Sequence, residues 1–153
     1  KYQLSVDYLE TKSTNCGNNI TNLLALISEN KLEMESILLI QDATMQLRMD
    51  ATLRKFLSKE IPIINYPAYE VEVISSNNQL EYDSNISSMW DMERYISLLM
   101  GEIPRLMDNT NGYGPKGKDF ISHVDVPEIV IEAYEELMEI FPDATRKANP
   151  NFA

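Results

Sequence analysis

The order of strand-like and helix-like patterns constrains the fold of this chain more than any single motif does. Strands are expected where apolar residues alternate with polar ones or form short runs, at residues 2–8, 36–40, 61–66, 69–73 and 120–126. Helices are expected where apolar residues recur three and four apart, at residues 20–27, 45–57, 86–103 and 127–141. This alternation predicts an α/β fold: a single three-layer domain with a mostly parallel sheet of about five strands flanked by helices.

The predicted domain spans residues 1–142 and is followed by an irregular tail at 143–153, which contains Pro150 and shows no periodicity. A chain of 153 residues is long enough for one ordinary domain. The uninterrupted apolar run at 36–40 is typical of a central strand covered on both faces. Asn77, Asn78 and Gln79 predict a turn, and the polar residues 80–85 read as a connection.

The charge balance and the cysteine content limit the function classes. Acidic residues outnumber basic ones by 24 to 13, so the chain lacks the basic surface that nucleic acids require. A basic protein, or another chain of the same protein, is a more suitable partner, although acidity also simply favours solubility. One cysteine excludes a disulfide framework, and no apolar run is long enough to cross a membrane, so we expect a cytoplasmic location. The chain begins at Lys1 and reads as a piece of a longer protein.

A glycine-rich loop is the first candidate ligand site. It contains Gly112, Gly114 and Gly117, three of the chain's five glycines, with Lys116 and Lys118 on either side of the last one. Glycines this dense allow a backbone with positive φ and a close approach to a ligand, and the lysines could neutralise an anion. The spacing matches no known phosphate-binding motif, and a surface loop whose lysines serve solubility is the alternative.

A second candidate ligand site precedes the first predicted helix. Thr14, Asn15 and Cys16 lie in a small, polar stretch, where the free N–H groups of a helix N-terminus could bind a phosphate or carboxylate. Cys16 could also act as a nucleophile there. The alternatives are that capping and turn formation explain this composition, and that Cys16 is an ordinary small residue beside a turn glycine.

Three residues are candidates for catalysis. His123 is the only histidine, and Asp125 would share its face of a strand, so that His123 could act as a general base oriented by Asp125. Asp42 follows the 36–40 strand, at the sheet edge where ligands bind in α/β folds. The alternatives are an N-cap role for Asp42 and a capping box formed by Asp125 and Glu128. No cofactor is indicated, and no spacing specifies a metal site.

Two functions remain open on these observations. The first is an acidic α/β binding or regulatory domain of a larger protein or complex, with a small anion as an additional ligand. The second is a small enzyme that acts on a phosphorylated or carboxylated metabolite with His123 as general base. An enzyme should bring His123, Asp42 and the glycine loop to one pocket, whereas a binding module should show scattered candidates and an exposed patch.

Overall fold

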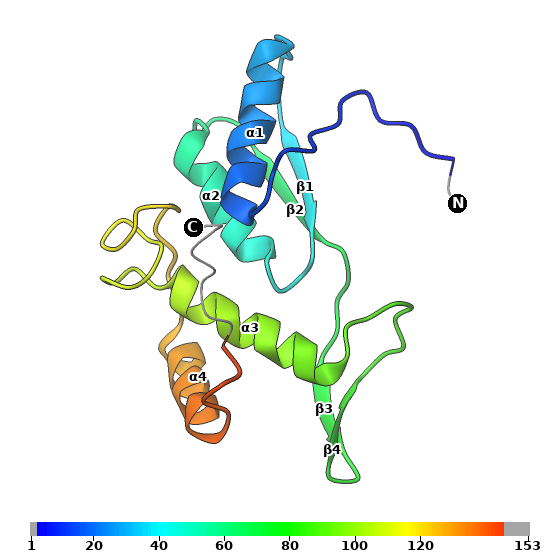
Figure 1. Ribbon diagram of the computed structural model, residues 1–153, viewed down its shortest axis with the longest axis vertical. Coiled ribbons are helices and arrows are strands. Elements are labelled where there is room, and N and C mark those ends of the chain that lie inside the picture. Colours follow the sequence, from blue (N-terminus) through cyan, green and yellow to red (C-terminus); the bar gives the residue numbers. More distant parts are fainter. Residues whose placement is uncertain (1–2, 146–153) are drawn as a thin grey trace.

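The computed structural model describes residues 3–145. In chain order its elements are α1 (Cys16–Glu29), β1 (Ile37–Gln41), α2 (Gln46–Phe56), β2 (Ile63–Pro67), β3 (Val73–Ser76), β4 (Gln79–Tyr82), α3 (Met92–Leu106) and α4 (Glu128–Ile140). The strands form two small sheets, a parallel β1–β2 pair and an antiparallel β3–β4 pair (Figure 1). The fold is therefore α/β, but the prediction of a single, mostly parallel sheet of about five strands is wrong.

The main core lies on one face of the β1–β2 pair, where α1 and α2 cover it (Figure 1). Leu39 of β1 packs there with Ile20 of α1 and with Met49 and Leu53 of α2. Because successive strand residues point to opposite faces, Leu38 and Ile40 point away from these helices and are exposed. The expectation that this strand is covered on both faces is therefore wrong for the described part of the chain.

The first and last predicted strands do not form. Residues 3–14 contain no strand, and Tyr2 lies outside the described residues. Residues 120–126 are irregular, and the backbone groups at their start bond to a loop and a helix instead of to a strand. The N–H groups of Phe120 and Ile121 donate to the carbonyl of Tyr113. Both the N–H and the Oγ of Ser122 donate to the carbonyl of Ala51 in α2, each at 3.0 Å. Next to them, Ile121 is buried against Ala51 and Leu106. An alternating pattern of apolar and polar residues therefore does not by itself produce a strand, because a strand also needs a neighbouring strand to pair with.

The β3–β4 hairpin lies in a region for which the sequence predicted only one strand. Asn77 and Asn78 have φ of 50° and 61°, which is the left-handed pair that a two-residue hairpin turn requires, so the predicted turn is confirmed at these two residues. Gln79, also predicted in the turn, is instead the first residue of β4. β3 begins at Val73, where the predicted 69–73 strand was expected to end, and β4 replaces the expected polar connection. The ring of Tyr82 meets that of Tyr95 edge-on at 5.4 Å, which fixes the hairpin to α3.

The four predicted helices are present with shifted ends. Asp91 accepts a hydrogen bond from the N–H of Arg94 and caps α3, so this helix begins later than the apolar spacing predicted. Pro104 lies within the last turn of α3, and Pro127 directly precedes α4. None of the helices in residues 3–145 combines the length and apolar content needed to cross a membrane. The predicted tail at 143–153 lies outside the described residues from position 146 onward.

Candidate functional site

A cavity of about 700 Å³ lies between the start of α1, the helices α2 and α3, and residues 113–121. Its wall brings together positions that are far apart in the sequence. Thr14, Asn15 and Cys16, all three predicted as ligand-binding, border it at the start of α1. The charged side chains that line it are Arg48, Arg94, Glu102, Arg105, Lys118 and Asp119. Four basic groups thus face two acidic ones in a chain whose net charge is −11.

The start of α1 is capped from within the chain. The N–H of Asn18 donates to Asn15 Oδ1 at 2.9 Å, and Asn18 Oδ1 in turn accepts from the N–H of Asn15 at 2.9 Å. This reciprocal capping box confirms the alternative that capping accounts for the asparagines at these two positions. It does not use the N–H groups of Cys16 and Gly17, which have no acceptor inside their own helix and lie on the wall of the cavity.

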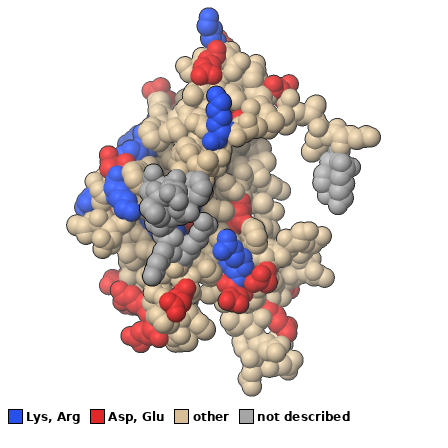
Figure 2. Space-filling model, in the orientation of Figure 1, with Lys and Arg blue, Asp and Glu red and all other residues tan. Residues whose placement is uncertain are grey.

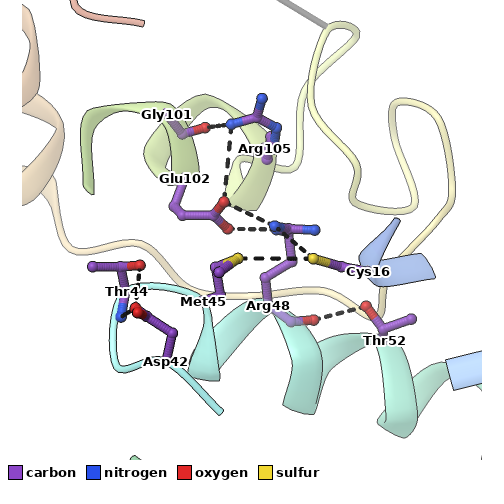
Figure 3. Close-up of polar contacts among 9 residues, drawn as sticks. All are labelled: Cys16, Asp42, Thr44, Met45, Arg48, Thr52, Gly101, Glu102 and Arg105. Atoms are coloured by element: carbon purple, nitrogen blue, oxygen red, sulfur yellow. Dashed lines mark hydrogen bonds and ion pairs between the residues drawn. The ribbon is translucent and has the colours of Figure 1, made fainter. Parts of the chain in front are cut away.

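Arg48 of α2 lines the cavity beside the start of α1 (Figure 3). Its guanidinium makes a two-point contact with Glu102 of α3, in which Nε donates to Oε2 and Nη2 donates to Oε1 at 2.8 Å. Nη2 also lies 3.4 Å from Cys16 Sγ. Burial alone would lower the pKa of Arg48, but the hydrogen bonds and charge of Glu102 raise it above its usual value, so Arg48 stays charged.

Two basic side chains line the cavity without an acidic partner. Arg94 of α3 lies over the Trp90 ring at 5.9 Å, and Lys118 Nζ lies 5.1 Å from the centre of the Tyr113 ring. Within residues 3–145 neither of them forms an ion pair with a carboxylate. The acidic groups, in contrast, are already paired: Glu102 with Arg48, and Asp119 with Lys55. The cavity therefore has an excess of positive charge that a bound anion would neutralise.

The glycine loop is packed against itself. No glycine in residues 3–145 has positive φ, so the expected left-handed backbone is absent. A Cβ on Gly112 would overlap the Met107 carbonyl, and one on Gly117 would overlap that of Asn109. A Cβ on Gly114 would lie 2.6 Å from Asp108 Oδ1. These glycines permit close backbone contact within the loop, and none of the three lines the cavity.

The two lysines of the loop point to different places. Lys118 lines the cavity, as its predicted ligand-binding role requires. Lys116 does not line it: its N–H donates to Asp108 Oδ1 at 2.7 Å, and its Nζ lies 4.0 Å from Asp108 Oδ2. Of the ligand-binding residues predicted in this loop, only Lys118 lines the cavity, and Tyr113 of the same loop, which was not predicted, lines it as well.

His123 lies between two carboxylates. Nε2 is 2.8 Å from Asp125 Oδ1, and Nδ1 is 2.7 Å from Asp108 Oδ2. These hydrogen bonds, first that of Asp125 and then that of Asp108, raise the pKa of His123. Both ring nitrogens face acceptors, which suits an imidazolium better than a free general base. The alternative of a capping box at Asp125 is wrong, because Pro127 precedes α4 and no side chain caps it.

Asp42 is the centre of a hydrogen-bond network at the end of β1. Oδ1 accepts from the N–H and hydroxyl of Thr44 and from the Tyr69 hydroxyl, and Oδ2 accepts from Trp90 Nε1 at 2.6 Å. Burial opposes its charge, yet these bonds lower the pKa of Asp42. The N-cap alternative is wrong, since Met45 holds that position in α2. Asp42, His123 and Asp125 are all absent from the lining of the cavity.

Sequence reasoning missed the basic and acidic residues that the helices contribute to the cavity. One signal was available, because Arg48 interrupts the apolar stripe of α2 at three residues from Met45. Glu102 likewise follows Leu99 at three residues in α3. A charged residue inside an apolar stripe often marks a buried ion pair or a site. Within residues 3–145 no group of three His, Cys, Asp or Glu side chains is placed to hold a metal ion. No protein-family model matches the chain.

Proposed function

We propose that this chain is a binding module that holds a small anionic ligand, such as a phosphate or carboxylate, in the cavity beside α1. The observation that carries the proposal is the charge of the lining, where basic groups are in excess although the chain as a whole is strongly acidic. Arg94 and Lys118 supply charges that no carboxylate within residues 3–145 pairs with, and the N–H groups of Cys16 and Gly17 supply directed donors. Arg48, held in place by Glu102, adds a guanidinium beside Cys16 on the same lining.

The positions of the catalytic candidates favour the binding module over the enzyme. None of the three catalytic candidates lines the cavity, and each already has polar partners. His123 contacts Asp108 and Asp125, Asp125 contacts His123, and Asp42 accepts hydrogen bonds from three donor side chains. A binding or regulatory role within a larger protein or complex needs no such catalytic set. The cytoplasmic location that we infer rests on the single cysteine.

The test is titration with inorganic phosphate and with citrate, followed by calorimetry. We expect Lys118→Gln and Arg94→Gln each to weaken binding about fivefold to tenfold, because each removes one charged contact. Lys116→Gln is the matched control, since it removes the same charge from the same loop outside the cavity. Equal losses in Lys116→Gln and Lys118→Gln would indicate only general attraction of anions to the loop, and would contradict the proposal.

The single histidine distinguishes the two functions in the same experiment. Because His123 does not line the cavity, its proton NMR signals should stay in place when phosphate binds. A change of its pKa on addition of a phosphorylated or carboxylated metabolite would place the ligand at His123 and would favour the enzyme instead.

A further inference from the structure

One face of the β1–β2 pair is apolar and uncovered. The register places Leu38 beside Ile64, and Ile40 beside Tyr66. All four side chains lie on the face away from α1 and α2, and they are 56%, 54%, 59% and 61% exposed in that order. Four neighbouring apolar side chains at this exposure form a continuous patch, which monomeric proteins usually cover.

The strands that form this patch carry no charge and have open edges. Neither Ile37–Gln41 nor Ile63–Pro67 contains an acidic or basic residue. Within residues 3–145, β1 and β2 pair only with each other, so each has one edge with unpaired backbone groups. An uncharged strand with an open edge readily accepts another strand or sheet.

An unpaired segment with a complementary pattern lies on the same side of the molecule. Residues 3–9 project from the body on the side of the sheet away from α1 and α2 (Figure 1). Leu4, Val6 and Tyr8 alternate along this segment with polar residues, and all three are exposed. When extended, residues 4–8 would present these three side chains on one side and so suit packing on an apolar sheet, but within residues 3–145 the segment forms no strand and the three side chains stay exposed.

We propose that a second copy of this chain covers the open face of the β1–β2 pair, with residues 3–9 of each copy packed in the same two-fold interface. The area is sufficient for this. At roughly 100 Å² of apolar surface for each partly exposed side chain, the four sheet residues and the three of the segment supply about 700 Å² per copy. A standard stable interface needs about 800 Å² per partner, and the backbone of residues 3–9 adds further contact.

Charge also favours a second copy over the basic protein that the overall acidity suggested. A basic partner needs carboxylates to contact, and this surface offers only Asp7, which alternates with Val6 and Tyr8 and so points away from their side. The carboxylates gather elsewhere, over α4 (Figure 2). Two copies of a chain with a net charge of −11 repel each other in general, and the uncharged sheet face is where they can meet at least cost.

The experiment is sedimentation equilibrium of the 153-residue chain at micromolar concentration. We expect a dimer whose dissociation constant falls as salt is added, because salt screens the repulsion between two acidic copies. Ile40→Lys and Val6→Lys should each raise the dissociation constant at least about tenfold, as charges buried in an apolar interface do. Ile64→Thr, a smaller change that the strand tolerates, should raise it less but measurably.

Ile129→Lys is the matched control, because Ile129 is an exposed isoleucine on α4, away from the sheet. It should leave the dimer intact. Circular dichroism establishes that each variant is folded. A monomer at every concentration and salt level overturns the proposal. So does a dimer that Ile40→Lys and Ile64→Thr leave unchanged, or one that Ile129→Lys disrupts as strongly. Phosphate binding at the cavity is measured separately, so failure of one proposal leaves the other standing.

Discussion

At the scale of single residues, Gly112 is the glycine at which adding one methyl group should destabilise the fold most. A Cβ there would overlap the carbonyl of Met107, and backbone atoms cannot move aside as the end of a side chain can. We expect Gly112→Ala to lower the free energy of unfolding by about 3 kcal/mol, at the upper end for overpacking. Gly17→Ala is the control, because its nearest neighbour is a side-chain oxygen at 3.3 Å and its effect should stay within about 0.5 kcal/mol. Similar unfolding midpoints in urea for the two variants would contradict this reading of the loop.

His123 belongs to the same scale, and its two carboxylates give it a pH dependence of known sign. Its folded pKa is raised above the ordinary value of 6.5. The stabilisation is therefore fully present below that value, where the ring is charged in both states, and is lost as the pH rises through the folded pKa. We expect the difference in unfolding free energy between the wild type and His123→Gln to shrink across this range. Proton NMR should also show a lower pKa for His123 in Asp125→Asn. If the difference in unfolding free energy between the two proteins grew with pH instead, the folded pKa of His123 would be lowered rather than raised.

At the scale of elements, the ion pair of Arg48 and Glu102 is the polar link between α2 and α3. Their side chains are only 11% and 8% exposed, so loss of one partner leaves a buried charge unpaired. We expect Glu102→Gln to destabilise the protein by about 3 to 5 kcal/mol, and the double change Arg48→Met with Glu102→Leu to recover most of the loss. Urea unfolding of the wild type, the single variant and the double variant checks this. A double variant as unstable as the single one would mean that the pair stabilises by shape rather than by charge.

Elements defined by local patterns were predictable, and those that depend on distant partners were not. The α1 helix follows from its apolar spacing, and the hairpin turn follows from Asn77 and Asn78. Ser122, in contrast, lies in a stretch that alternates like a strand yet bonds to the carbonyl of Ala51, and no local signal reveals that partner. The residues that line the cavity likewise could not all be predicted from local patterns. Cys16 and Lys118 were named from their own segments, but Arg48 lines the same cavity only because α2 packs beside α1 (Figure 1).

At the scale of the whole molecule, the chain leaves more surface in water than a closed domain of its size. Its accessible surface is 11141 Å², whereas a folded monomer of this mass has about 7900 Å². The excess has visible sources in the uncovered sheet face and in α4, which has no buried residue. A chain that leaves this much surface in water, including the apolar face of its sheet, is suited to an assembly, which agrees with the proposed pairing of two copies.

The excess surface predicts how steeply the free energy of unfolding falls with denaturant concentration. The denaturant slope m scales with the area exposed on unfolding, and this monomer buries about a fifth less area than a compact chain of equal length. In dilute solution, where copies are apart, we expect an m value in urea about a fifth below that of a compact domain of this size. At higher concentration, the midpoint should rise, because dissociation must accompany unfolding. A full-sized m value with no concentration dependence would mean that the chain closes its own sheet, with residues 3–9 packed on β1 and β2 of the same copy. Folding alone would then cover the open face, and no second copy would be needed.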